Sequence, residues 1–140
     1  MTCPLCTDDG GEMLWRDDLC RVILVQDRQY PGFCRVILNE HVKEMTDLGV
    51  AEQMQLMRTV FATERALRVV AAPDKINLAS LGNQVPHLHW HVIPRFMDDA
   101  HFPDPIWGAP HRDGARHPVQ AERLREQLSE LLGASGVRRQ

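Results

Sequence analysis

Three histidines stand at every second position of an otherwise apolar segment. His87, His89 and His91 are each separated from the next by a single apolar residue. Because successive side chains of a β-strand point to opposite faces of a sheet, this spacing puts all three imidazoles on one face. The intervening apolar side chains then face a core. The alternation predicts a strand over residues 87–93 that separates a hydrophobic core from a surface that carries chemistry.

Aligned imidazoles suit two kinds of chemistry. They can ligate one metal ion, as three-histidine zinc sites do, or they can divide the roles of nucleophile, proton donor and ligand. Side chains two residues apart start about 6.6 Å from each other, so His87 and His91 start about 13 Å apart, which disfavours one ion held by all three. A neutral imidazole is a ready nucleophile, because its ordinary pKa of about 6.5 leaves one ring nitrogen unprotonated.

The rest of the chain predicts an α+β fold with a five-stranded antiparallel sheet. Runs rich in β-branched residues, bounded by turn residues such as Pro31 and Gly32, indicate strands. Strands followed by a helix and then by further strands are typical of this fold class. The predicted strands span residues 12–16, 20–25, 33–38, 75–81 and 87–93.

Two helices are expected to accompany the sheet. Thr46 or Asp47 can cap a long amphipathic helix that ends near Ala71, and Pro118 can open a C-terminal helix with a stripe of leucines. Apolar residues of the long helix recur at three- and four-residue spacing, which predicts that they form its core face. These residues are Val50, Met54, Met57, Val60, Phe61 and Leu67.

Length and composition indicate one domain and argue against two classes of partner. The chain has 140 residues, 44% of them apolar, so we expect a single domain over residues 1–133 and a flexible tail over 134–140. The formal charge of −3 argues against nucleic-acid binding. The longest segment without charged side chains, residues 76–94, holds His, Asn and Gln, so we expect no membrane span.

The N-terminal segment predicts a cytoplasmic protein with reduced cysteines, because it lacks the charged and apolar regions of a secretory signal. Cys3 and Cys6 have the CxxC spacing of half a zinc site or of a redox pair. Redox pairs stand where a strand meets a helix, and no such pattern is nearby, so zinc is favoured. Cys20 and Cys34 lie in apolar runs, where we expect them to be buried and without function.

A long segment rich in Pro, Asp and Gly, residues 97–117, follows the histidine strand. Loops of this length in compact domains tend to be functional or disordered. Trp107 is expected to lie over a purine, to close a dimer interface or to anchor the loop to its own domain. The three histidines of the loop, His101, His111 and His117, are expected to be exposed.

The segment from His87 to Arg95 resembles the signature of the histidine-triad (HIT) family, whose members are nucleotide hydrolases and transferases. The chain looks like the bacterial members that resemble diadenosine tetraphosphate hydrolase. The resemblance covers residues 3–95 and implies a HIT-like fold and a homodimer. The further matches, in chain order, are Pro31-Gly32, His41, Asn77, Asn83 and Val85.

This resemblance implies a two-step displacement at phosphorus. The middle histidine of the triad, which is His89 here, would attack the α-phosphate of a purine nucleotide or dinucleotide, and His91 would contact that phosphate. The leaving group departs with a proton, and water then hydrolyses the nucleotidyl-histidine to release a nucleoside monophosphate. The bond cleaved is a phosphoanhydride or a phosphoramidate, and no organic cofactor is implied.

The resemblance also implies a structural zinc site. Zinc-bearing members pair an N-terminal CxxC with two histidines, which correspond to His41 and His87. Together with Cys3 and Cys6 these would form a closed tetrahedral site that supports folding and does not attack the substrate.

Five residues are implied to bind the substrate. Asn83 stands where the family commonly has Gln, with Gln84 beside it, and either amide can help hold the leaving-group oxygen. Asp27 is expected to bind the ribose hydroxyls or to form an Asx turn. Arg95 is expected to contact a phosphate or to be a solvated surface residue. Asn77 is the fifth residue, because its position ahead of Asn83 and the triad resembles the order of motifs in the family.

Two other classes of function stay open at this stage. One is a zinc-stabilised module that binds nucleotides or a partner protein with little turnover, although a pure binder has no need of a nucleophile at His89. The other is a metallohydrolase that uses the triad as ligands. Metal removal distinguishes the metallohydrolase from a nucleotidyl-histidine enzyme. Chelation abolishes the activity of a metallohydrolase directly, whereas a nucleotidyl-histidine enzyme loses only stability.

Overall fold

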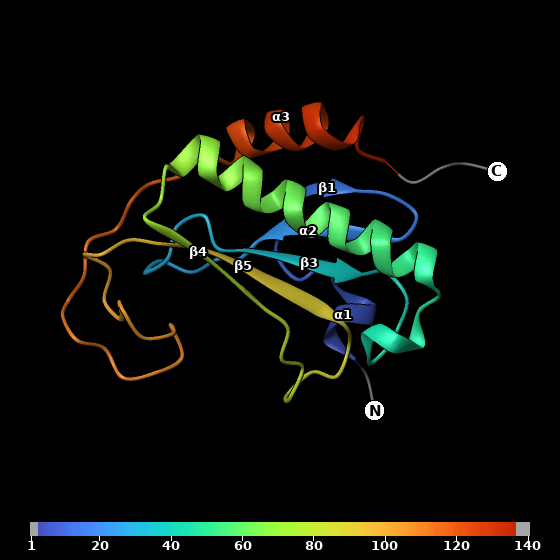
Figure 1. Cartoon of the computed structure of the whole chain (residues 1–140), viewed down its shortest axis with the longest axis horizontal. Coiled ribbons are helices and arrows are strands. Elements are labelled where there is room, and N and C mark those ends of the chain that lie inside the picture. The colour runs from blue at the N-terminus through green and yellow to red at the C-terminus, as the bar shows by residue number, and fades with distance from the viewer. Residues whose placement is uncertain (1–2, 137–140) are drawn as a thin grey trace.

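The computed structural model describes residues 3–136 and confirms an α+β fold built on a five-stranded antiparallel sheet (Figure 1). The strands are β1 (Glu12–Arg16), β2 (Cys20–Leu24), β3 (Cys34–Leu38), β4 (Lys75–Ala79) and β5 (His89–Arg95). They follow the order β1-β2-β3-β5-β4 across the sheet. The histidine strand β5 therefore lies inside the sheet, paired with β3 on one side and β4 on the other.

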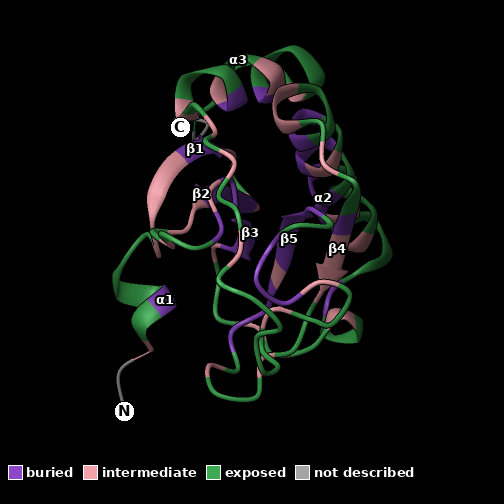
Figure 2. Ribbon diagram, turned by 90° about the vertical axis from the view of Figure 1, so that its left-hand side faces the viewer, coloured by how far each residue is buried: buried purple, intermediate pink, exposed green. Residues whose placement is uncertain are grey.

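Helices cover the two faces of the sheet unequally. The helical elements are α1 (Pro4–Thr7), the 3-10 turn η1 (Met45–Asp47), α2 (Val50–Ala71) and α3 (Ala121–Leu132). The long helices α2 and α3 lie side by side on one face, whereas the short α1, which the sequence did not predict, lies on the opposite side (Figures 1 and 2). The long helices therefore leave that opposite face uncovered.

Strand alternation sorts the side chains between these two faces. Val36 and Val92 point into the main core beneath α2 and α3. Ile37, from the next position of β3, points the other way and joins Leu5 of α1 in a smaller cluster. Buried residues accordingly concentrate on the sheet and on the inner sides of the long helices (Figure 2). His89 is the cross-strand partner of Ile37, so its face is the one away from α2.

The predicted start of the long helix is wrong by a few residues. Thr46 and Asp47 belong to η1, and α2 begins after Gly49, whose backbone N–H donates to the Glu52 carboxylate at 3.2 Å. This contact satisfies one of the free N–H groups at the helix start. The end of α2 at Ala71 agrees with the prediction.

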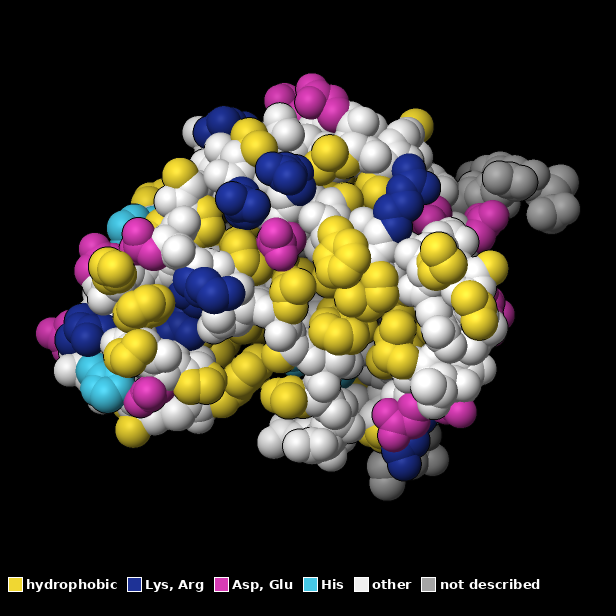
Figure 3. Space-filling model, in the orientation of Figure 1, with side chains coloured by type: hydrophobic (Ala, Val, Ile, Leu, Met, Phe, Trp, Pro, Cys, Tyr) yellow, Lys and Arg dark blue, Asp and Glu magenta, His cyan; other side chains and the backbone are white. Residues whose placement is uncertain are grey.

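The predicted core face of α2 also needs correction. Val50 and Met54 are 70% and 69% exposed, and Phe61 is exposed as well. The buried side is narrower and includes small residues that let the helix lie close to the sheet: Leu56, Thr59, Val60, Ala62, Thr63, Ala66 and Leu67. Hydrophobic side chains therefore gather on the outer surface over α2 (Figure 3).

The chain leaves α3 and returns to the sheet edge. Leu124 and Leu128 bury α3 against the core as predicted. Beyond the helix, the Gly136 N–H donates to the Arg16 carbonyl at 2.7 Å, and the Arg16 N–H donates to Ser135 Oγ at 2.9 Å. Residues 137–140 lie outside the described residues, so the flexible tail stays a prediction. Within residues 3–136, no helix has both the length and the apolar content needed to cross a membrane.

Candidate functional site

Strand β5 presents two of the three histidines to one cavity. His89 and His91 are 8% and 5% exposed, and their ring centroids lie 5.0 Å apart. Their cross-strand neighbours on β3 are Ile37, opposite His89, and Arg35, opposite His91. An open cavity of about 670 Å³ lies in front of them. Its other polar or aromatic lining includes Asn83, Gln84 and Trp107.

The backbone sets the protonation of His89. Its Nδ1 lies 2.6 Å from the carbonyl oxygen of His87. Because a carbonyl oxygen only accepts, Nδ1 carries the proton, and Nε2 keeps a free lone pair. Burial lowers the pKa of His89, and the charge of Arg35 adds to this effect against the opposing hydrogen bond to His87. His89 is therefore a neutral imidazole with an available nitrogen at neutral pH.

His91 has the complementary tautomer. The Nε of Arg35 donates to His91 Nδ1 at 3.3 Å, so the proton of a neutral ring resides on Nε2. Burial lowers the pKa of His91 to about 4, helped by the charges of Arg35 and His89. Trp107 lies against this ring with centroids 5.0 Å apart. His91 can thus act as a neutral hydrogen-bond donor beside a neutral nucleophile.

The third histidine belongs to a different cluster. His87 Nδ1 lies 3.4 Å from Cys3 Sγ and 3.5 Å from Cys6 Sγ, and His41 Nδ1 lies 3.4 Å from Cys6 Sγ. All four ligand atoms lie within 4.8 Å of one another. In a tetrahedral zinc site with bonds of about 2.0–2.3 Å, neighbouring ligand atoms stand about 3.3–3.8 Å apart. The four residues predicted as ligands therefore come together with spacings that fit a Cys2His2 zinc site.

The surroundings of His87 also suit metal binding. Its Nε2 lies 2.6 Å from the Leu38 carbonyl oxygen, which holds the proton on Nε2 and leaves Nδ1 free toward the cysteines. Hydrogen bonds of this kind orient metal-ligating histidines. Among the described residues, the group that can share one ion includes His87 but neither His89 nor His91. The metallohydrolase alternative, with the triad as joint ligands, is therefore not supported.

Of the five residues predicted to bind substrate, two line the cavity, one forms a turn, and the other two form a second group. Asn83 and Gln84 line the cavity with His89 and His91. The Asx turn considered for Asp27 is present, since its Oδ1 accepts from the backbone N–H groups of Gln29 and Tyr30 at 2.9 and 3.2 Å.

Arg95 and Asn77 form the second group, and here the expectations need correction. Arg95 is only 2% exposed, so it is not a solvated surface residue. Its guanidinium donates to both Asp99 carboxylate oxygens at 2.9 and 3.1 Å and to Asn77 Oδ1 at 2.7 Å. A further donation reaches the Asp104 carbonyl at 2.7 Å. These contacts occupy the Arg95 guanidinium and hold the loop in place, which argues against a phosphate contact by Arg95, whereas substrate binding by Asn77 stays a prediction.

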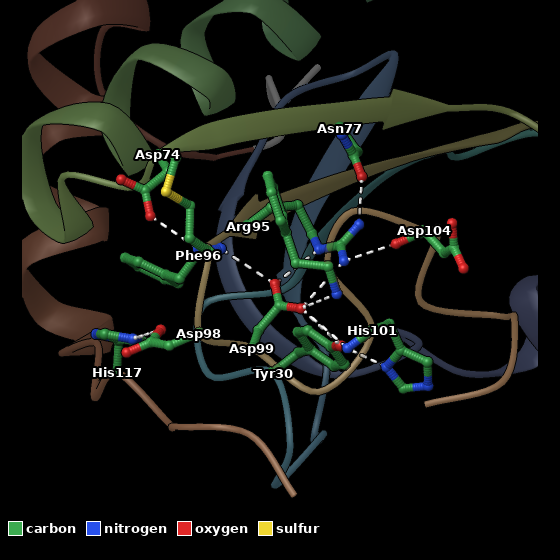
Figure 4. Close-up of polar contacts among 12 residues, drawn as sticks. Tyr30, Asp74, Asn77, Arg95, Phe96, Asp98, Asp99, His101, Asp104 and His117 are labelled. Atoms are coloured by element: carbon green, nitrogen blue, oxygen red, sulfur yellow. Dashed lines mark hydrogen bonds and ion pairs between the residues drawn. The ribbon is translucent and has the colours of Figure 1, made fainter. Parts of the chain in front are cut away.

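Asp99 is the centre of this network (Figure 4). Besides Arg95, it accepts from the backbone N–H groups of Phe96, His101 and Phe102. Burial raises the pKa of Asp99, but the hydrogen bonds from Arg95 and the backbone outweigh it and hold the pKa at about 2. The Tyr30 hydroxyl also contacts the Asp99 carboxylate. The long loop is thus ordered by a buried, ionised carboxylate.

The loop histidines are not all exposed. His101 is 6% exposed, and its Nδ1 contacts the Tyr30 hydroxyl at 2.5 Å, so the prediction was wrong for this residue. His111 is exposed as expected, whereas His117 is only partly exposed. His117 contacts Asp98 at 2.8 Å and stacks on Phe96.

Arg35 and Asp99 were not among the residues predicted from the sequence. A signal for Arg35 was present, because a charged residue within a β-branched run is unusual and strand pairing can place it beside a histidine. Asp99 gave no signal, since Asp in a loop is ordinarily a turn residue on the surface. Cys20 and Cys34 are buried as predicted, and burial raises the pKa of each thiol to about 12.

Comparison with known proteins defines the class of protein. The HIT domain family matches residues 9–98, more than half of the chain. The chain is 30% identical over 112 residues to the AP-4-A phosphorylase of Mycobacterium tuberculosis, covering 76% of this chain and 57% of that protein. It is 32% identical over 72 residues to the bis(5'-adenosyl)-triphosphatase of Saccharomyces cerevisiae, covering 47% of this chain and 35% of that protein. The chain thus spans little more than half of the first relative and about a third of the second.

Solved structures agree on the fold. A histidine triad protein from Bradyrhizobium japonicum has a TM-score of 0.64 and 32% identity, covering 86% of this chain and 88% of its own. A zinc-bound histidine triad family protein from Mycobacterium smegmatis has a TM-score of 0.61 and 23% identity, covering 94% and 96%. This chain belongs to the HIT family.

Proposed function

We propose that this protein is a hydrolase that cleaves a phosphoanhydride or phosphoramidate bond at the α-phosphate of a purine nucleotide or dinucleotide, with His89 as the nucleophile. The observation that carries the proposal is the 2.6 Å contact of His89 Nδ1 with the His87 carbonyl, which leaves Nε2 free to attack. The names of the two relatives, which refer to AP-4-A and to a bis(5'-adenosyl) triphosphate, support an adenine dinucleotide as substrate.

The first step forms a bond between His89 Nε2 and the α-phosphorus and breaks the bond to the leaving group. His91 donates a hydrogen bond from its Nε2–H to a phosphate oxygen, since Arg35 occupies the acceptor nitrogen of the ring. The leaving group departs with a proton from solvent, and the water consumed in the second step returns a proton to solvent. Asn83 and Gln84 are placed in the cavity wall to hold the leaving-group oxygen.

The second step releases the nucleotide. Water attacks the phosphorus of the nucleotidyl-histidine, the P–N bond breaks, and a nucleoside monophosphate departs. His89 returns to its starting tautomer because the His87 carbonyl still accepts from Nδ1. For Asp27 we retain the proposal that it binds the ribose hydroxyls. A cytoplasmic homodimer remains our expectation for the functional form.

We infer that Cys3, Cys6, His41 and His87 bind a zinc ion. The Cys2His2 donor set and the 3.4–3.5 Å spacings support it, as does the resemblance in fold to the zinc-bound protein from M. smegmatis. Such an ion supplies a cross-link among three distant segments, and the chemistry at phosphorus uses the protein's own histidines. Asp27, His89 and His91 are not among its ligands.

Intact-protein mass spectrometry tests the nucleophile. The protein is incubated briefly with diadenosine tetraphosphate or adenosine 5'-phosphoramidate and quenched without acid. We expect an adenylyl adduct on the wild type and on His111→Ala, which changes an exposed loop histidine. His89→Ala should give no adduct and no released AMP, while keeping the melting temperature of the wild type within a few degrees.

Two results would contradict this proposal. An adduct that persists in His89→Ala would move the nucleophile elsewhere. Folded wild-type protein that binds nucleotide but forms neither adduct nor AMP would favour the alternative of a zinc-stabilised nucleotide-binding or interaction module with little turnover.

A further inference from the structure

Among the described residues that line the cavity, Arg35 is the single lysine or arginine. It stands opposite His91 in the β3–β5 ladder, and its Nε donates to His91 Nδ1 at 3.3 Å. The guanidinium carbon lies 5.4 Å from the ring centroid of Phe33, so an aromatic face covers one side of the cation. Arg35 is half-buried, and its charge therefore sits at the cavity wall beside His91.

A second arginine shows how unusual this arrangement is. Strands β2 and β3 have the same five-residue sequence, Cys-Arg-Val-Ile-Leu, so Arg21 and Arg35 are each the second residue of a strand, at opposite ends of the antiparallel pair. Arg21 is buried, and its guanidinium is occupied by oxygens of the chain itself. Its acceptors are the carbonyls of Leu5, Asp8 and Asp9 and the amide oxygen of Asn39.

Among the described residues, the Arg35 guanidinium has no comparable set of hydrogen-bond acceptors. Within residues 3–136, its hydrogen bond is the one to His91, and no carboxylate lies within ion-pair distance of it. Burial lowers the pKa of its guanidinium, and the charge of Asp27 opposes that decrease from farther away. A half-buried cation without an anion in contact has a desolvation cost that a bound anion offsets. The planar fork of a guanidinium suits phosphate oxygens in particular.

We propose that Arg35 binds a phosphate of the leaving group and thereby selects substrates whose leaving group is a phosphate or polyphosphate. The inference rests on the proposed function for the identity of the attacked phosphate. Ile37 stands opposite His89, so Arg35 lies one ladder step from the nucleophile, next to the residue that contacts the α-phosphate. A phosphate adjoining the α-phosphate belongs to the leaving group, because ribose is the other neighbour. An amine leaving group offers Arg35 no such partner.

Kinetics with two substrates test this selection. The kcat/KM values for diadenosine tetraphosphate and adenosine 5'-phosphoramidate are compared among the wild type, Arg35→Met, Arg35→Lys and Arg58→Met. Arg58 is an exposed residue of α2 and serves as the matched control for loss of one positive charge. Arg35→Met should reduce kcat/KM for the tetraphosphate about tenfold more than for the phosphoramidate, as loss of a charged hydrogen bond predicts. Arg35→Lys should be intermediate, and Arg58→Met should match the wild type.

Equal losses for the two substrates would overturn the inference, because Arg35 would then act only by positioning His91. No loss in Arg35→Met would overturn it as well.

A binding measurement separates this inference from the proposed function. Calorimetric titration with ADP and AMP needs no turnover, and Arg35→Met should weaken ADP binding about tenfold more than AMP binding. If Arg35→Met weakens ADP binding in this way but the wild type forms no adduct, Arg35 is a phosphate-binding residue and the proposed hydrolase function is wrong. If the wild type forms an adduct on His89 but Arg35→Met leaves the ratio of ADP to AMP affinity unchanged, the proposed hydrolase function stands and the proposed role of Arg35 is wrong.

Discussion

The two ends of strand β5 hold irregular segments of the chain in different ways. At its start, His87 meets Cys3, Cys6 and His41, and these residues bring the N-terminal segment and the loop after β3 together. At its other end, Arg95 is buried with Asp99, which orders the long loop. The nucleophile candidate His89 and its neighbour His91 lie between these two anchors.

The two ends differ in whether their polar groups already have partners within the chain. At the His87 end, thiols and imidazoles come together in a group that could hold a metal cation at its centre. At the Arg95 end, a cation, a carboxylate and several N–H donors are already matched within the chain. We therefore propose that stability at the first end depends on metal supply, whereas stability at the second end depends on the chain alone.

The largest effect is expected from Arg95→Met, which leaves the Asp99 carboxylate buried without its cation. Breaking a buried ion pair from one side typically costs about 3–5 kcal/mol, and we expect a loss of that size in the free energy of unfolding by urea. The double variant Arg95→Met/Asp99→Asn should lose less than the sum of the two single variants. A loss below about 1 kcal/mol in Arg95→Met would show that this end is not a closed network.

Removal of the metal should destabilise only the His87 end of β5. At free zinc about 100-fold above the dissociation constant, a bound ion contributes about 2.7 kcal/mol to the free energy of unfolding, and a chelator removes it. The wild type and the surface variant His111→Gln should both respond, whereas Cys6→Ser should lose most of the response. Unfolding curves that are identical in zinc and in chelator would remove the proposed difference between the two ends.

Acid should destabilise the Arg95 end in a window set by Asp99. The folded-state pKa of about 2 lies below the ordinary 3.8, so the unfolded chain takes up this proton first as the pH falls. The stabilisation is complete above pH 4 and is lost toward pH 2, by roughly 2 kcal/mol. The difference in unfolding free energy between the wild type and Asp99→Asn, measured in chelator, should shrink across that window. A difference that stays constant would mean that Asp99 is not ionised in the folded protein.

The smallest effect is expected from Asp98→Asn. The ion pair of Asp98 with His117 is 2.8 Å long, but both side chains are exposed. Exposed pairs of this kind contribute about 0.2–1 kcal/mol, so the melting temperature should fall by no more than a few degrees. A loss equal to that of Arg95→Met would show that burial does not distinguish the Asp98–His117 pair from the Arg95–Asp99 pair.

The His87 end was predictable from sequence, whereas the Arg95 end was not. The CxxC spacing of Cys3 and Cys6 by itself suggests half a metal site, and the family resemblance implies His41 and His87 as the other two ligands. Arg95, Asp99 and His101 are types that usually lie on the surface, and their burial follows from long-range contacts that local sequence does not encode. The exposed face of α2 has the same origin, because periodicity allows more than one apolar stripe to face the sheet.

The sequence by itself determined the strands, the single face of the alternating histidines and the resemblance to the HIT family, because side-chain period and residue type act locally. Only the tertiary structure decided which strand lies beside β5. That pairing places Arg35 next to His91, while Arg21 donates to the N-terminal segment and His87 joins the cluster of Cys3, Cys6 and His41. The physical reason is that strand pairing and burial are properties of the assembled sheet, where a charge must find its partner in space.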